Sequence, residues 1–142
     1  MRDYFIDNKD GTVTDIRTGL MWQQESSPTI CIFKDAETYC KELILAGYSD
    51  WRLPTREELK DLAEPMHYWI DHIAIDTQYF PDTKPKFYWS SSPFGDLGSG
   101  VEFEWGDPYS RYLSDKGNVR AVRGRKYDII IKEDKIKEDY DC

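Results

Sequence analysis

The chain has 142 residues, a formal net charge of −8 and a pI of about 4.8, and aromatic residues make up 15% of it. This length suits a single domain with its own hydrophobic core. The acidic balance argues against nucleic-acid binding, and also against heparin-like binding unless Lys and Arg gather on one face. Since no apolar run approaches the roughly 20 residues of a bilayer-spanning helix, membrane insertion is not expected.

The first residues are expected to form short antiparallel strands. Residues 4–14 predict a β-hairpin, because Asp10 and Gly11 form a pair that is typical of tight hairpin turns. A second turn at residues 17–19 leads into a strand over residues 20–23. The sequence therefore predicts a hairpin followed by another strand at the start of the chain.

Two helices are expected next. Apolar residues spaced i, i+3, i+4, i+7 and i+8 within residues 35–45 predict the first helix. Thr55 and Glu58 form a capping-box pair that predicts a second helix over residues 56–63. The apolar stripe of the first helix consists of Ala36, Tyr39, Cys40, Leu43 and Ile44.

The remainder is expected to be mostly strands and loops. Residues 64–86 contain three prolines and are predicted to be irregular, with core anchors at Ile70, Ile73, Ile75 and Phe80. The tail from residue 125 is charged, and its isoleucines at 129–131 could add an edge strand. The predicted strands are 87–91, 101–105, 109–113 and 119–123, with a Gly/Ser-rich loop over 92–100. This order of strands, two helices and strands predicts the α+β class.

Motifs that run in order along the chain resemble a known family. The longest is Ala46-Gly-Tyr-Ser-Asp-Trp-Arg-Leu-Pro-Thr55, where a turn leads into the second helix. Others are Asp10-Gly-Thr-Val-Thr-Asp15, Thr18-Gly-Leu-Met-Trp22, Tyr88-Trp-Ser-Ser91 and Val119-Arg-Ala-Val-Arg-Gly124. With these motifs the chain resembles the DUF1566 domain, also called the Lcl C-terminal domain. The resemblance implies one domain over residues 1–124 and a separate charged tail over residues 125–142.

The resemblance also implies a C-type-lectin-like fold of the formylglycine-generating-enzyme-like branch. Such a fold has two helices flanking a small twisted antiparallel sheet, with long loops on one side. The oxidases of that branch need paired cysteines near the C-terminal end, and residues 106–123 contain none. Their chemistry is therefore not carried over, and no catalytic residue, metal ligand or cofactor is assigned.

The cysteines are Cys31, Cys40 and Cys142. Many proteins that resemble this chain carry a cysteine where Ala121 stands, and that cysteine would be the natural partner of Cys40. Here Cys40 is left to pair with Cys31 or Cys142, or to stay reduced. Its place on the apolar stripe of the first helix favours a structural role.

Candidate ligand contacts lie between residues 92 and 112, where glycines, acids and aromatic residues mix. Aromatic rings stack on the C–H faces of sugars, while Asp and Arg bind hydroxyl groups. Trp22, Trp51 and Trp89 lie inside the family motifs and are expected in the core. The predicted ligand-binding residues are Trp105, Asp107, Tyr109, Arg111 and Tyr112.

Three arginines in the family motifs are expected to pair with buried carboxylates rather than to bind ligands. They are Arg52, Arg120 and Arg123, and Asp50 is a candidate partner.

These observations favour a non-enzymatic binding module for a glycan or a protein surface. The resemblance implies bacterial surface attachment in a secreted or cell-surface setting, sometimes as a homo-oligomer, although this chain shows no signal peptide. One alternative is a diverged metal-dependent enzyme that uses His67 or His72. Another is a structural subunit of a larger assembly, in which residues 129–131 extend a partner's sheet.

Overall fold

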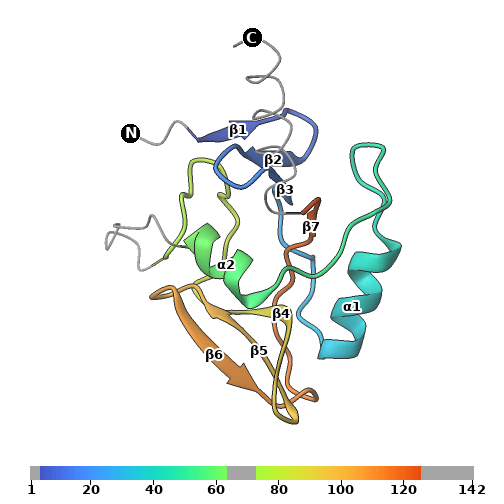
Figure 1. Ribbon diagram of the computed structural model, residues 1–142, viewed down its shortest axis with the longest axis vertical. Helices are drawn as coiled ribbons and strands as arrows, with labels where there is room; N and C mark the ends of the chain where they lie inside the picture. The colour runs from blue at the N-terminus through green and yellow to red at the C-terminus, as the bar shows by residue number, and fades with distance from the viewer. Residues whose placement is uncertain (1–3, 64–72, 126–142) are drawn as a thin grey trace, which may run out of the picture.

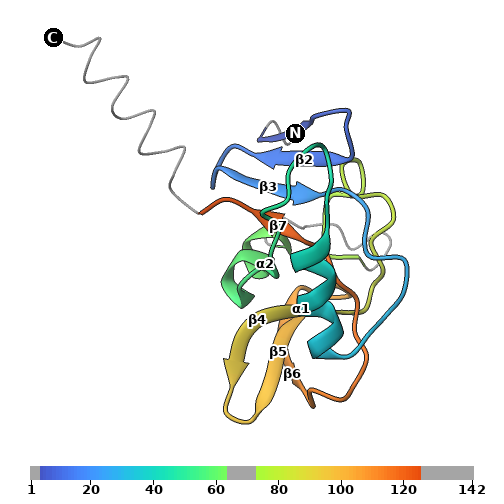
Figure 2. The same cartoon turned by 90° about the vertical axis from the view of Figure 1, so that its right-hand side faces the viewer.

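The computed structural model describes residues 4–63 and 73–125. Two helices and two small antiparallel sheets build an α+β fold, and the sheets lie at opposite ends of the long axis (Figure 1). In the view turned by 90°, helix α2 still lies between the two sheets (Figure 2). The family resemblance implies one small sheet. In the structure the last strand pairs with β3 in the N-terminal sheet, and three other strands form a second sheet.

The first sheet has the strand order β1-β2-β3-β7. The predicted hairpin turn at Asp10 and Gly11 and the predicted turn at residues 17–19 are both confirmed. Gly11 has a φ of +91°, a left-handed conformation that glycine adopts without strain. Strand β7 is shorter than the predicted 119–123. The bounds are β1 Phe5–Asp7, β2 Thr12–Asp15, β3 Leu20–Gln23 and β7 Val122–Arg123.

The second sheet consists of β4 (Phe87–Phe94), β5 (Leu97–Glu102) and β6 (Asp107–Arg111), in that order. The predicted loop over residues 92–100 is wrong, because most of it forms the β4–β5 hairpin. Backbone pairing continues to the end of β4, and the chain reverses around Gly95, whose φ is +60°. The glycines and serines that suggested a loop instead allow close packing between strands.

The two following strand predictions were displaced along the chain. Strand β5 ends at Glu102 rather than residue 105, and β6 occupies 107–111 rather than 109–113. Beyond this end the Phe103 N–H still donates to the Lys86 carbonyl at 2.9 Å, which continues the β4–β5 register, whereas the Phe103 carbonyl accepts from the Ala74 N–H at 2.6 Å. The Gly106 N–H donates to the Glu102 carbonyl at 2.9 Å, and this turn ends β5.

Helix α1 spans Phe33–Glu42, so it begins and ends earlier than the predicted 35–45. Leu43 already has extended backbone angles, and its N–H donates to the Cys40 carbonyl. The predicted inward position of Ile44 is wrong, since 75% of this side chain is exposed. Cys40 is buried as expected.

Helix α2 spans Arg56–Ala63, as predicted. Its capping box is confirmed in both directions. The Thr55 N–H donates to Glu58 Oε1 at 2.8 Å, and the Glu58 N–H donates to Thr55 Oγ1 at 3.1 Å. This local arrangement fixes where the helix begins, as the sequence pattern indicates.

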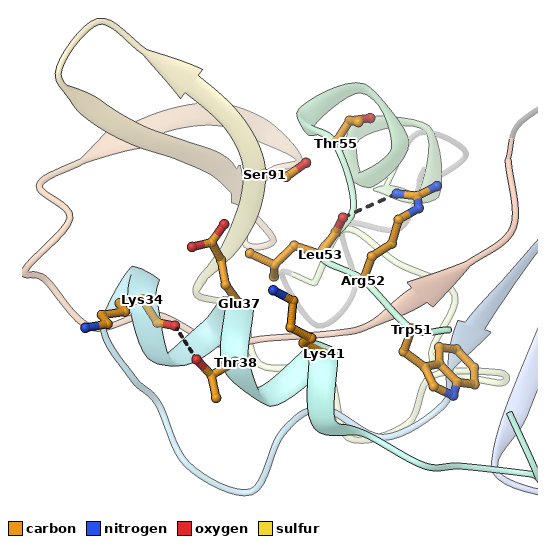
Figure 3. Close-up of a pocket in the computed structure, with 9 residues that line it drawn as sticks. All are labelled: Lys34, Glu37, Thr38, Lys41, Trp51, Arg52, Leu53, Thr55 and Ser91. Carbon is orange, nitrogen blue, oxygen red and sulfur yellow. Dashed lines mark hydrogen bonds between the residues drawn. The ribbon is translucent and has the colours of Figure 1, made fainter. Parts of the chain in front are cut away.

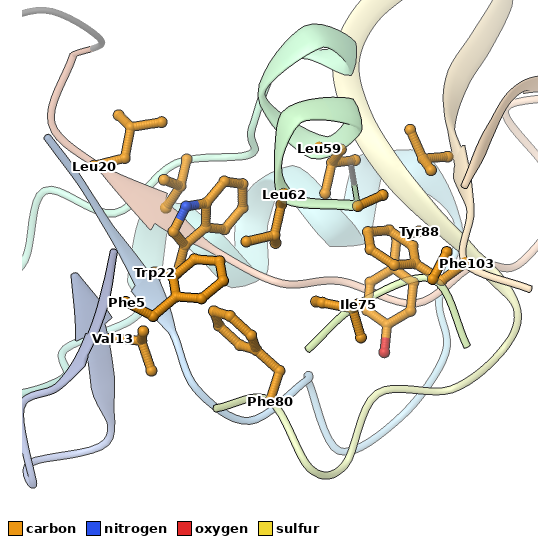
Figure 4. Packing of buried hydrophobic residues seen from close by; sticks show 14 residues of the cluster. Phe5, Val13, Leu20, Trp22, Leu59, Leu62, Ile75, Phe80, Tyr88 and Phe103 are labelled. Atoms are coloured by element: carbon orange, nitrogen blue, oxygen red, sulfur yellow. The ribbon is translucent and has the colours of Figure 1, made fainter. Parts of the chain in front are cut away.

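The core consists of two clusters that meet at strand β4. Figure 4 shows the larger cluster, in which Trp22 and Phe80 pack with residues of α2. Tyr88 belongs to that cluster, whereas Trp89 belongs to the second one, together with Trp51 and residues of α1. Successive side chains of a strand alternate between its faces, so β4 supplies both clusters. The core positions predicted for the three tryptophans are confirmed.

Residues 73–86 contain no helix or strand, in agreement with the prediction, and Ile75 and Phe80 anchor them to the core. The predicted anchor Ile70, the histidines 67 and 72, and the possible tail strand at 129–131 lie outside the described residues.

Candidate functional site

Three arginines hold together segments that are far apart in the chain. Arg52 forms an ion pair with Glu58, and Arg123 forms one with Asp50, at 2.8 Å and 2.6 Å respectively. Asp50, the predicted candidate partner, thus pairs with Arg123, but its side chain is 61% exposed and not buried. Bonding to the Arg123 guanidinium lowers the pKa of the Asp50 carboxyl below its ordinary value.

Arg120 is almost fully buried and has the most hydrogen bonds of the three. Its Nη1 donates to the carbonyls of Gln23 and Gln24, and its Nη2 donates to Thr83 Oγ1 at 2.8 Å. The carboxylate of Asp82 lies 3.3 Å from Nη2. Because these groups satisfy most of its donors inside the protein, Arg120 holds the β3 end against residues 82–83 and does not face a ligand.

One cavity, of about 620 Å³, lies between α1 and the segment that enters α2 (Figure 3). Charged side chains of α1 line one side of it, and Leu53 lies opposite. Several of its polar groups already have partners: Arg52 binds Glu58, and the Thr55 hydroxyl caps α2. The lining residues are Lys34, Glu37, Thr38, Lys41, Trp51, Arg52, Leu53, Thr55 and Ser91.

A second cavity, of about 400 Å³, lies between the start of α2 and the second sheet. Phe94 and Tyr109 border it, and more than half of each side chain is exposed. Arg56 Nη1 donates to the Ser99 hydroxyl at 3.4 Å, and the backbone N–H of Arg56 donates to Ser92 Oγ. Pro108 and Ser110 complete the lining, so rings and polar donors face the same space.

A third cavity, of about 390 Å³, borders the end of β6 and the turn before residue 118. Four of its eight lining residues are cationic. The guanidinium carbon of Arg111 lies 4.8 Å from the centre of the Phe87 ring, and its Nη1 donates to the Lys116 carbonyl at 3.3 Å. The lining residues are Ile30, Lys84, Lys86, Phe87, Arg111, Lys116, Gly117 and Asn118.

The five predicted ligand-binding residues do not gather around any one of these three cavities. Tyr109 borders the cavity beside Arg56, whereas Arg111 borders the cationic one. Trp105 lies in the turn between β5 and β6 and is half exposed, and Tyr112 lies just beyond β6 and is 68% exposed. Asp107 is exposed at the start of β6.

The sequence analysis missed Phe94 and Arg56 as neighbours of Tyr109. The two residues are 38 positions apart in the sequence, so no spacing rule links them, and Phe94 fell in the segment taken for a loop. The sequence does contain one indication that Phe94 is exposed. Phe94 directly precedes the Gly95-Asp96 pair, and a Gly-Asp pair favours a hairpin turn whose flanking side chains face solvent.

The cysteines within the described residues are free thiols. Burial, together with a smaller contribution from the neighbouring Cys31, raises the pKa of Cys40 to about 12. Such a thiol is a packing group at neutral pH and not a nucleophile.

Among residues 4–63 and 73–125, no three His, Cys, Asp or Glu side chains are placed to share a metal ion. The helices in this part of the chain are also too short and too polar to cross a bilayer.

The family model of the Lcl C-terminal domain matches residues 11–123, which is most of the chain. The match includes both helices and every strand except β1. No curated protein has a matching sequence.

Proposed function

Because the chain belongs to the Lcl C-terminal domain family, we propose that it is a non-enzymatic binding module that recognises a glycan. The observation that carries the proposal is the pair of exposed rings, Phe94 and Tyr109, which border one cavity together with Arg56. We refer to this cavity, lined by Arg56, Phe94, Ser99, Pro108, Tyr109 and Ser110, as the aromatic cavity.

The chemistry of the aromatic cavity suits a sugar ring. An exposed aromatic side chain offers a flat apolar face to the C–H groups of a sugar, and it needs no partner when the ligand is absent. The guanidinium of Arg56 has one side-chain bond in the described residues, the long one to Ser99, so further N–H groups remain to bind sugar hydroxyls. A volume of about 400 Å³ lies within the usual range for small-ligand sites.

The proposed setting is bacterial and extracytoplasmic, either secreted or on the cell surface. The proposed fold is C-type-lectin-like, of the formylglycine-generating-enzyme-like branch. The α+β class and the family membership support this setting. In lectin-type domains a rigid frame holds variable loops and hairpins, and ligand specificity depends on those segments.

The test is glycan-array binding of the purified full chain. We expect Tyr109→Ala to reduce binding of the best glycan about five- to thirtyfold, since stacking on one ring contributes on the order of 1–2 kcal/mol. Arg56→Gln should reduce binding while leaving the ring in place. Tyr48→Ala is the control, because Tyr48 is an exposed ring outside the second sheet.

Three results would count against the proposal. Binding that survives both Tyr109→Ala and the Trp105→Ala/Tyr109→Ala double change would move the site away from this sheet. Equal losses in the Tyr48→Ala control would indicate a general effect of ring removal. A chain that binds no glycan but captures a protein through the same two rings would favour a protein surface as the ligand, since exposed aromatic residues also anchor protein interfaces.

A further inference from the structure

The strongest unassigned feature is the concentration of positive charge around the third cavity. We call it the basic groove, and we define it by the eight residues that line it, given above. Lys84 and Lys86 come from the segment before β4, Arg111 from the end of β6, and Lys116 from the turn that follows. No carboxylate is among the lining residues, although the chain as a whole has a net charge of −8.

The three lysines of the groove make no ion pair with any carboxylate in the described part of the chain. Elsewhere in this part of the chain, four arginines, at 17, 52, 120 and 123, all have acidic partners. Like charges brought together repel one another, so a group of cations without acids is less favourable than a mixed surface. A bound anion would remove that repulsion.

Arg111 is the most constrained cation of the groove. Its guanidinium packs over the Phe87 ring and donates to the Lys116 carbonyl, so part of its conformational freedom is already lost before any ligand binds. A guanidinium held in this way keeps further N–H groups in a planar fork, which matches the two oxygens of a carboxylate or phosphoryl group. The lysines supply mobile point charges around it.

We propose that the basic groove binds a small polyanion that carries at least two carboxylate or phosphoryl groups. Four cations on three separate segments match several anionic groups better than one. A volume of about 390 Å³ suits a small molecule, and the ring of Phe87 and the side chain of Ile30 add apolar surface beside the charges. This site is independent of the aromatic cavity and of the glycan proposed there.

The test is isothermal titration of the full chain at low ionic strength with two probes, pyrophosphate and citrate, and with acetate as a monovalent comparison. Binding of citrate alone identifies carboxylate ligands, and binding of pyrophosphate alone identifies phosphoryl ligands; either result, or binding of both, supports the proposal. We expect acetate to bind far more weakly, and the affinity of the polyanion to fall as salt is added.

The variant Lys84→Gln/Lys116→Gln should raise the Kd of the bound probe about tenfold or more, because two direct charge contacts are lost. The matched control is Lys34→Gln/Lys60→Gln, which removes the same charge from exposed lysines on α1 and α2. Arg111→Lys keeps the charge but removes the planar fork, so it should also weaken binding. Thermal unfolding of all the variants checks that each of them folds.

The proposal is overturned if neither probe binds at millimolar concentration. It is also overturned if the control variant weakens binding as much as the groove variant does, because affinity would then follow total charge and not this site. Equal binding of acetate and citrate would likewise contradict a groove built for several anionic groups.

Discussion

Arg52 and Glu58 form an ion pair with two parallel hydrogen bonds, Nη1 to Oε1 at 2.8 Å and Nη2 to Oε2 at 2.9 Å. The same carboxylate accepts the Thr55 N–H, and Arg52 Nη2 also donates to the Gly124 carbonyl at 2.7 Å. Glu58 therefore caps the start of α2 and, through Arg52, also connects α2 to the backbone just after β7.

Glu58→Gln should lower the free energy of unfolding by about 1–3 kcal/mol, because the change leaves the partly buried Arg52 without its counter-charge. The Arg52 side chain is about one-third exposed, so solvent screens part of this loss. Chemical denaturation measures the effect. Glu57→Gln, on the exposed side of the same helix turn, is the control and should change stability by less than about 0.5 kcal/mol.

The same pair predicts a pH dependence. Burial opposes ionisation of Glu58, yet the bonds from Arg52 and Thr55 outweigh it and lower its pKa below the ordinary glutamate value of 4.5. A lowered pKa stabilises the fold above the unfolded value, and this stabilisation disappears as the pH falls through the folded value. The stability difference between the native chain and Glu58→Gln should therefore shrink between about pH 6 and about pH 3. A constant difference over that range would contradict the role of the charge.

Gly100→Ala should destabilise the second sheet strongly. An added Cβ would lie 1.9 Å from the Tyr88 carbonyl oxygen, which is backbone and cannot move without breaking strand pairing. We expect a loss of about 3 kcal/mol or more, measured by thermal or chemical unfolding. Gly95→Ala is the comparison: nothing lies within 4 Å of its added Cβ, but its φ of +60° makes alanine cost about 1 kcal/mol.

Cys40 should resist alkylation in the folded protein. With a pKa of about 12, roughly one molecule in ten thousand carries the thiolate at pH 8, and burial blocks the reagent as well. Iodoacetamide labelling followed by peptide mapping should show Cys31 modified well before Cys40, since Cys31 is partly exposed. In denaturant the two should react at similar rates; a fast reaction of Cys40 in the native state would place it near the surface.

Features encoded by neighbouring residues could be predicted from the sequence. The capping box of Thr55 and Glu58, the hairpin turn at Gly11 and the burial of the motif tryptophans all depend on short spacings and on side-chain size. Errors arose where a distant segment competes for the backbone. The carbonyl of Phe103, for example, accepts from Ala74 in a segment outside the sheet, and no local pattern contains that bond.

The candidate sites were less predictable than the fold elements. Tyr109 and Arg111 are two positions apart on β6, and the sequence assigned them to one binding region. In the structure they border different cavities, because Arg111 packs over Phe87 while Tyr109 meets the start of α2. Which residues share a cavity depends on the packing of three or four segments, not on their order.

The sequence by itself determined the α+β class, the family and the position of α2, because capping, turn and burial preferences act over a few residues. Only the tertiary structure decided that the strands divide into two sheets and that Lys84, Lys86, Arg111 and Lys116 meet around one groove. The physical reason is that hydrogen bonds and packing between segments far apart in the chain set these arrangements, and their energies are absent from any short window of residues.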